Sequence, residues 1–199
     1  MNSIRTIALV GLLAASFRLV DPLNCLAESD HPQQVSEELR GQAVDVLRQT
    51  LDHESRWVKV HAAEFLLALD HPQGVAEAFA KELDESAGVP EYRIGIWRVL
   101  SRAAIGEEQR SEWTTKIRDV FLDEDAPDRL HAAETLGKLG YVVRGEGDEL
   151  FDREAQSVDS QLSVYTLWVL AISGQEGTVA RLAEALASNE AKLRSTAAY

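Results

Sequence analysis

The stretch DAPDRLHAAETLGKLG, residues 125–140, decides the fold that we predict for this chain. Pro127 and Asp128 suit the first turn of a helix, where no amide donor is needed and negative charge is favourable. Four apolar residues recur at helical spacing on one face: Leu130, Ala133, Leu136 and Leu139. Gly140 supplies the left-handed residue that commonly ends a helix. The stretch therefore predicts an amphipathic helix whose two ends are both marked.

The composition extends this prediction to the whole chain. Of the 199 residues, 45% are apolar and 27% are charged, which is enough apolar surface for a packed core. Helix-forming residues dominate, and none of the five prolines breaks a long apolar-periodic segment. Alternating Val, Ile and Thr runs bounded by turns are missing from the sequence. An all-α fold is therefore predicted.

Echoes of the opening stretch recur along the chain. The segment HAAEFL at 61–66 parallels HAAETL at 131–136. The residue just before each apolar stripe can be followed from segment to segment: Lys59, Arg93, Arg129, Ser163 and Arg194. These positions are separated by 34, 36, 34 and 31 residues. A near-constant period of two helices per step is typical of a solenoid, in which each helix pair packs on its neighbours.

The repeats resemble HEAT repeats of the short bacterial type called phycobilisome-lyase-type HEAT-like repeats. Residues 128–140 match the pattern of that family well, residues 58–63 and 193–198 match it in part, and the units at Arg93 and Ser163 match mainly in spacing and apolarity. The resemblance implies a right-handed α-solenoid of stacked antiparallel helix pairs. It would cover 54–199 as about four pairs plus a truncated terminal unit. Because the steps are shorter than the roughly 40–47 residues of long HEAT units, tetratricopeptide-like pairing remains the alternative.

Residues 1–27 are predicted to be a signal peptide. Arg5 gives a positive start, the run at 7–17 is apolar but too short to span a bilayer, and Cys25 and Ala27 place small residues before a cleavage point. This interpretation predicts a periplasmic or secreted protein with no membrane insertion after the signal is removed. The alternative is an N-terminal helix that stays on the protein.

Cys25 is the only cysteine, and residues 22–24 before it match a lipoprotein signal poorly. Soluble export is therefore favoured over lipid anchoring. Residues 28–53 are predicted to form a polar lead-in followed by a capping helix.

The charge and the missing motifs narrow the function. A net charge of −13 argues against nucleic acid as a partner, because phosphate binding depends on clustered Lys and Arg. The sequence contains no nucleophile elbow, no phosphate-binding glycine loop and no His-Glu-x-x-His motif. We therefore expect a non-catalytic module that binds a protein partner or serves as a scaffold, with no cofactor, metal or catalytic residues.

Two histidines keep an enzyme as the alternative. His61 and His131 each stand three residues before a glutamate, a spacing that places both side chains on one helix face. HEAT-like deoxyhypusine hydroxylases hold two irons with adjacent His-Glu pairs, and this chain has one adjacent pair, His53-Glu54, at a predicted turn. The resemblance thus leaves a metal-dependent hydroxylase or a chromophore lyase as the second hypothesis.

The expected partner surface follows from the solenoid. We expect the second helix of each pair to line the inner surface and to present six charged residues: Glu112, Lys116, Glu149, Arg153, Arg181 and Glu184. The basic residues of the repeated position have two interpretations, a stripe that binds an acidic partner or a set of contacts that join helix pairs, and the second is favoured. Glu190 to Tyr199 is expected to be a first helix without a partner, which allows end-to-end self-association.

Overall fold

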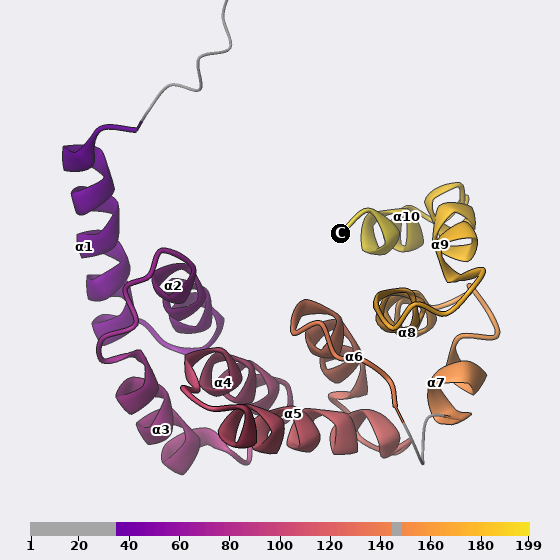
Figure 1. The fold of residues 1–199 in the computed structure, drawn as a ribbon, viewed down its shortest axis with the longest axis horizontal. Coiled ribbons are helices and arrows are strands. Elements are labelled where there is room, and N and C mark those ends of the chain that lie inside the picture. Colours follow the sequence, from indigo (N-terminus) through magenta and orange to yellow (C-terminus); the bar gives the residue numbers. More distant parts are fainter. Residues whose placement is uncertain (1–34, 145–148) are drawn as a thin grey trace, which may run out of the picture. The chain divides into compact units, whose positions relative to one another are not determined.

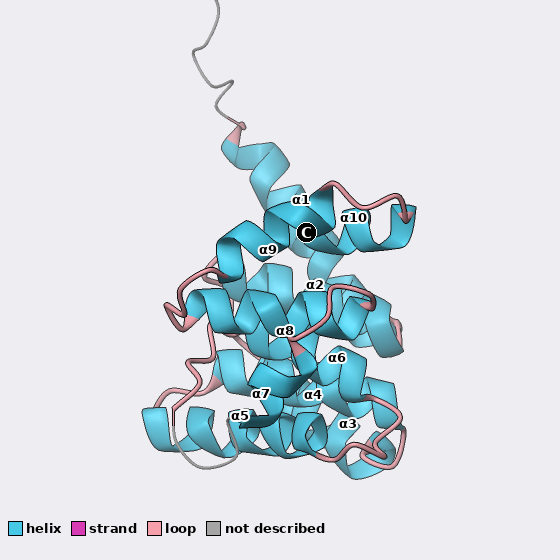
Figure 2. Ribbon diagram, turned by 90° about the vertical axis from the view of Figure 1, so that its right-hand side faces the viewer, coloured by secondary structure: helices cyan, strands magenta, loops and turns pink. Residues whose placement is uncertain are grey.

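A computed structural model describes residues 35–144 and 149–199. The chain divides into two units, Met1–Glu37, of which only 35–37 are described, and Glu38–Tyr199. Within the described residues the secondary structure is entirely helical (Figure 2). The helices are α1 (Glu37–His53), α2 (Arg56–Ala68), α3 (Val75–Ser86), α4 (Pro90–Ala103), α5 (Glu107–Leu122), α6 (Arg129–Lys138), α7 (Glu149–Glu154), α8 (Gln161–Ile172), α9 (Thr178–Leu186) and α10 (Ala191–Ala198). The predicted all-α fold is confirmed.

The helices of the unit Glu38–Tyr199 follow one another in two rows. Helices α2, α4, α6, α8 and α10 form the first-helix row, and each contacts the next member of that row. Helices α3, α5, α7 and α9 form the second-helix row, and the backbones of its described members lie farther from one another than those of the first-helix row do. Figure 1 shows the first-helix row on the inner side of the curve that this unit follows. Neighbour-on-neighbour packing of this kind is consistent with an α-solenoid.

Three first helices end in the same way, which is local evidence for repetition. Asp70, Gly140 and Gly174 follow α2, α6 and α8, and their φ angles are 63°, 66° and 81°. In each case the next amide donates to the carbonyl of a leucine four residues before the left-handed residue, at 2.8, 2.9 and 3.1 Å. This bond satisfies a carbonyl that the end of a helix leaves without a partner. The predicted left-handed role of Gly140 is thus confirmed.

The start of α6 differs from the expectation. The helix begins at Arg129, so Pro127 and Asp128 lie before its first turn rather than in it. Asp128 makes no side-chain cap bond, and its fully buried carboxylate instead accepts hydrogen bonds from Arg93 of α4 at 2.7 and 3.0 Å. A buried carboxylate is stable only when it is paired, so this contact between two helix pairs determines its position.

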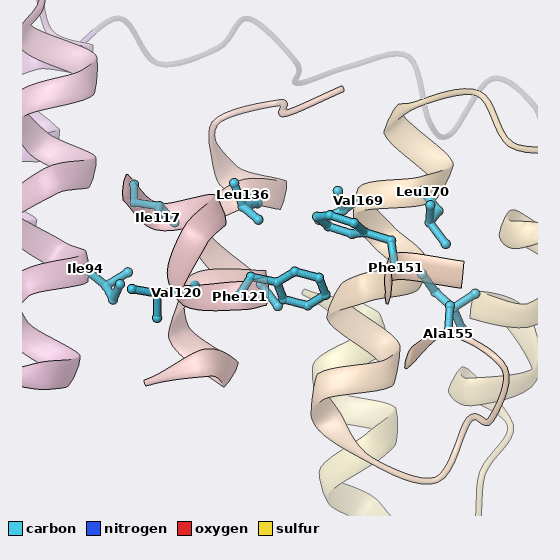
Figure 3. Packing of buried hydrophobic residues seen from close by; sticks show 12 residues of the cluster. Ile94, Ile117, Val120, Phe121, Leu136, Phe151, Ala155, Val169 and Leu170 are labelled. Atoms are coloured by element: carbon cyan, nitrogen blue, oxygen red, sulfur yellow. The ribbon is translucent and has the colours of Figure 1, made fainter. Parts of the chain in front are cut away.

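The core is distributed along the rows rather than gathered at one centre. The cluster drawn in Figure 3 extends across α4, α5, α6, α7 and α8, and in it the rings of Phe121 and Phe151 stack with centroids 4.2 Å apart. A second cluster lies among α1, α2, α3 and α4, and a third lies between α8, α9 and α10. Each helix pair therefore buries its apolar side chains against its immediate neighbours.

Two glycines allow close approach between neighbouring first helices. A Cβ atom at Gly137 of α6 would lie 2.4 Å from the ring of Trp168 on α8. A Cβ atom at Gly95 of α4 would lie 3.0 Å from the ring of Trp57 on α2. The large indole rings thus occupy the space that a side chain at these positions would need.

None of the helices described in 35–144 and 149–199 is long and apolar enough to cross a membrane. The predicted signal peptide, Cys25 and the beginning of the predicted lead-in lie outside the described residues.

Candidate functional site

The candidate site is a hollow of about 290 Å³ on the first-helix row, which we call the central hollow. Helix α2 contributes four of its lining residues, and α4, α6 and the residue after α10 contribute one each. The lining residues are His61, Glu64, Phe65, Ala68, Arg102, Lys138 and Tyr199. The hollow therefore joins residues that are far apart in the sequence.

Glu64, one of the lining residues of the central hollow, forms an ion pair that joins α2 and α4. The Arg98 side chain is 2% exposed and donates to both carboxylate oxygens of Glu64, from Nε at 2.7 Å and from Nη2 at 3.1 Å. A third donor, Nη1, reaches the hydroxyl of Thr135 on α6 at 3.2 Å. Because this buried guanidinium of α4 bonds to both α2 and α6, it fixes the relative positions of three successive helices.

Glu64 is held in its charged form. Burial disfavours the carboxylate, but the charges of Arg98 and Arg102 and the hydrogen bonds from Arg98 and His61 outweigh burial and lower the pKa of Glu64. Arg102 lies at the rim of the hollow, where its Nη1 donates to Glu64 at 3.0 Å. Two guanidinium groups therefore share one carboxylate, which leaves a net positive charge at this point.

The structure brings His61 and His131 to the same indole ring, although they belong to repeats two units apart. The ring centroid of Trp57 is 6.4 Å from that of His61 and 5.7 Å from that of His131, with which it stacks. In the repeat register, the position of these two histidines is occupied in the intervening unit by Gly95. Because Gly95 has no side chain, the ring of Trp57 can lie between the two histidines.

The donor set does not fit a di-metal centre. The residues that the structure describes include no group of three or more His, Cys, Asp or Glu side chains placed to hold a metal ion. Both glutamates of the predicted pairs are already bound to cations: Glu64 to two arginines, and Glu134 to Lys138 at 2.7 Å. A metal ion would have to displace these cations before it could use the carboxylates.

The basic residues of the repeated position do not form an open stripe. Three of the four make ion pairs: Lys59 with Glu82 at 2.7 Å, Arg93 with Asp128 at 2.7 Å, and Arg129 with Glu154 at 3.0 Å. The fourth, Arg194, is exposed and donates to the carbonyl of Ser188 at 2.8 Å. Arg93 joins two neighbouring helix pairs, as the stacking interpretation predicts. Lys59 and Arg129 instead join the two helices of a single pair. At these three places the repeated basic residue thus serves packing.

The six residues predicted to bind a partner lie on α5, α7 and α9. Figure 1 places these helices on the outer side of the curve, so the expectation that second helices line the inner surface is wrong. The physical reason is that neighbouring first helices pack directly on one another. The more closely spaced row of helices lies on the inner side of a curve.

Several of these six residues also make contacts within the chain. Lys116 lies 3.2 Å from Glu112 on the same helix, Arg153 pairs with Glu124 at 2.5 Å, and Arg181 donates to the carbonyl of Ala155. Glu149 and Glu184 are exposed. A role for the six residues in binding a partner stays a prediction.

The segment Glu190 to Tyr199 contains α10, which packs on α8 and α9 and buries Leu193 and Thr196. The exposed ring of Tyr199 lies 5.0 Å from the ammonium of Lys138 and borders the central hollow. End-to-end association through this segment stays a prediction.

Sequence reasoning identified His61 and His131 but missed Arg98, Arg102 and Phe65. Comparison with known proteins adds no assignment, since no family model, curated protein or solved structure matches the chain.

Proposed function

We propose that the chain is a non-catalytic module that binds a protein partner, built from right-handed HEAT-like repeats and exported from the cytoplasm. The observation that carries the proposal is the central hollow, where exposed aromatic and cationic side chains gather on the first-helix row. Phe65 is 59% exposed there, and Arg102 is 34% exposed beside it. Exposed aromatic and arginine side chains are the residues that most often dominate binding to a protein partner.

The repeated helix ends support the HEAT-like assignment, and a tetratricopeptide-like repeat is the alternative. The buried ion pairs support a structural use of the polar residues. Glu64, Asp128 and Glu154 all face cations from neighbouring helices, as they would in a scaffold whose charged groups hold helices together.

Affinity capture tests the binding role. The purified full chain serves as bait for a periplasmic or secreted extract of its host, with the heat-unfolded chain as the control bait. We expect a partner that the folded chain alone retains, and that binds saturably when both proteins are purified. Repeated capture without any such partner would count against the proposal.

The same preparation tests the enzymatic alternative. A metal-dependent hydroxylase or a chromophore lyase predicts bound metal or a visible absorption band in the purified chain. We expect elemental analysis and the absorption spectrum to show neither. A stoichiometric metal or chromophore would favour the alternative and contradict a cofactor-free module.

A further inference from the structure

The central hollow is a local exception to the charge of the chain. The whole sequence carries −13, yet the ionised side chains that line the hollow are two cations, Arg102 and Lys138, and one carboxylate, Glu64. Next to the lining residues, buried Arg98 pairs with Glu64 and Glu134 pairs with Lys138, so these two further charges offset each other. His61, which is 55% exposed at its side chain, adds a further positive charge when protonated. A ligand that enters here meets a positive surface.

The cations at the rim have donors to offer. Arg102 uses one nitrogen for Glu64 at 3.0 Å and another for the carbonyl of Lys138 at 3.4 Å, but a guanidinium carries five N–H groups. The ammonium of Lys138 lies 2.7 Å from Glu134, and an ammonium has three donors. A carboxylate placed between Arg102 and Lys138 would therefore gain charge-assisted hydrogen bonds without breaking those contacts.

Apolar surface lies next to these donors. Phe65 and Ala68 are exposed one turn apart on α2, and the ring of Tyr199 borders the hollow on another side. An exposed phenylalanine beside an arginine provides the two kinds of contact that anchor a peptide side chain: burial of apolar area and a fixed charge.

The size of the hollow selects the kind of ligand. Its volume of about 290 Å³ is just below the range for small-molecule sites, which is roughly 300–1,000 Å³. The space suits one or two side chains of a longer segment rather than a whole cofactor. Long-range repulsion from the acidic chain is largely screened beyond a Debye length, about 8 Å at physiological ionic strength, so the local cations decide the contact.

We infer that the central hollow binds an acidic segment of a protein partner, seating a carboxylate on Arg102 and Lys138 and an adjacent apolar side chain on Phe65. This inference rests on the proposed binding function and names the chemistry of the partner. It also locates the contact on the first-helix row, away from the charged residues of the second helices that the sequence suggested.

Selection from a random-peptide phage library on the full chain tests the inference. We expect the enriched peptides to place Asp or Glu next to an aromatic or aliphatic residue. A synthetic peptide of the enriched sequence, labelled for fluorescence anisotropy, should bind saturably, and its Glu-to-Gln or Asp-to-Asn version should bind about tenfold or more weakly.

Variants of the chain locate the site. Arg102→Gln and Phe65→Ser should each weaken peptide binding about tenfold or more. Arg110→Gln is the matched control, because Arg110 is an exposed arginine on α5 that pairs with Glu107 at 3.4 Å. Circular dichroism and thermal unfolding confirm that each variant is folded, which is expected because Glu64 keeps Arg98 when Arg102 is changed.

The outcomes separate this inference from the general binding role. Enrichment of basic or purely apolar peptides, no enrichment at all, or equal effects of Arg102→Gln and Arg110→Gln would each overturn the acidic-segment inference. If a captured partner still bound the purified chain in any of those cases, the proposed binding function would stand. If neither peptide nor partner bound, both would fail.

Discussion

Replacing Arg98 by methionine should cost the fold about 3 kcal/mol. The change removes two hydrogen bonds to Glu64, at 2.7 and 3.1 Å, and one to Thr135, at 3.2 Å, while methionine keeps most of the apolar stem. Removing one partner of a buried ion pair costs about 3–5 kcal/mol. We expect the lower end, because Glu64 is 13% exposed and keeps a contact with Arg102.

A double-mutant cycle tells whether this cost belongs to the pair. Glu64→Leu alone leaves the Arg98 charge buried and should also cost about 3 kcal/mol. The double variant replaces the pair by apolar side chains, so it should be no less stable than either single variant. The coupling energy would then be at least about 3 kcal/mol, the upper end of the range for residues in contact.

Urea unfolding at neutral pH measures these values. Tryptophan fluorescence and far-ultraviolet circular dichroism are followed together, because coincident transitions are needed before a free energy of unfolding can be assigned. A loss of about 3 kcal/mol corresponds to a decrease in Tm of roughly 6–12 °C for a domain of this size. A cost below about 1 kcal/mol for Arg98→Met, or costs that simply add in the double variant, would refute the reasoning.

Four further substitutions test the structure. The folded-state pKa of Glu64 is lowered, so this carboxylate contributes its full stability above the usual value of 4.5 and loses that contribution as the pH falls through the folded pKa. When the free energy of unfolding is measured as a function of acid pH, Glu64→Gln should therefore lose less stability than the wild type. Gly137→Ala should lower the free energy of unfolding by about 1–3 kcal/mol in the same urea assay, because the added Cβ would meet Trp168 at 2.4 Å. Gly41→Ala is the control: its Cβ would meet nothing within 4 Å, so it should raise the free energy of unfolding by about 0.5–1 kcal/mol. Asp128→Asn should cost about 1.5–3 kcal/mol in that assay, because the buried carboxylate accepts two charge-assisted hydrogen bonds; an unchanged midpoint would contradict that role.

The features of the fold that the sequence predicted are local ones. The apolar period of 3.6 residues places the helices, and Gly140 adopts the left-handed conformation because a residue without Cβ does so at little cost. The start of α6 was predicted two residues too early, because Pro127 and Asp128 have the chemistry of a first turn. The carboxylate of Asp128 does not cap α6 because it pairs with Arg93 of another helix, and the local sequence does not reveal that partner.

The candidate site depends on contacts between helices, and these have weak signals in one sequence. Arg98 resembles any charged residue of a helix, and its burial follows from the carboxylate opposite it rather than from its own neighbours in the chain. His61 and His131 reach the same indole ring, that of Trp57, because Gly95 leaves room for it. The sequence shows that Gly95 occupies the same repeat position as the two histidines, but it does not show that Trp57 lies against that glycine. Packing also decides which row of helices lies on the inner side. The sequence did not predict it, because the apolar patterns of the two rows are similar.

Charge at one repeat position carries information that the apolar pattern lacks. Glu64, Arg98 and Glu134 occupy equivalent places in three successive units, so the sign of the charge alternates from unit to unit. An apolar stripe can pack on more than one neighbour, whereas the Arg98 guanidinium of α4 finds its partners on Glu64 of α2 and Thr135 of α6. Separating α4 from α2 would leave the buried Arg98 charge without Glu64, which costs several kcal/mol. The buried pair therefore specifies which helix lies next to which, and the same arrangement turns Arg102 and Phe65 toward the central hollow.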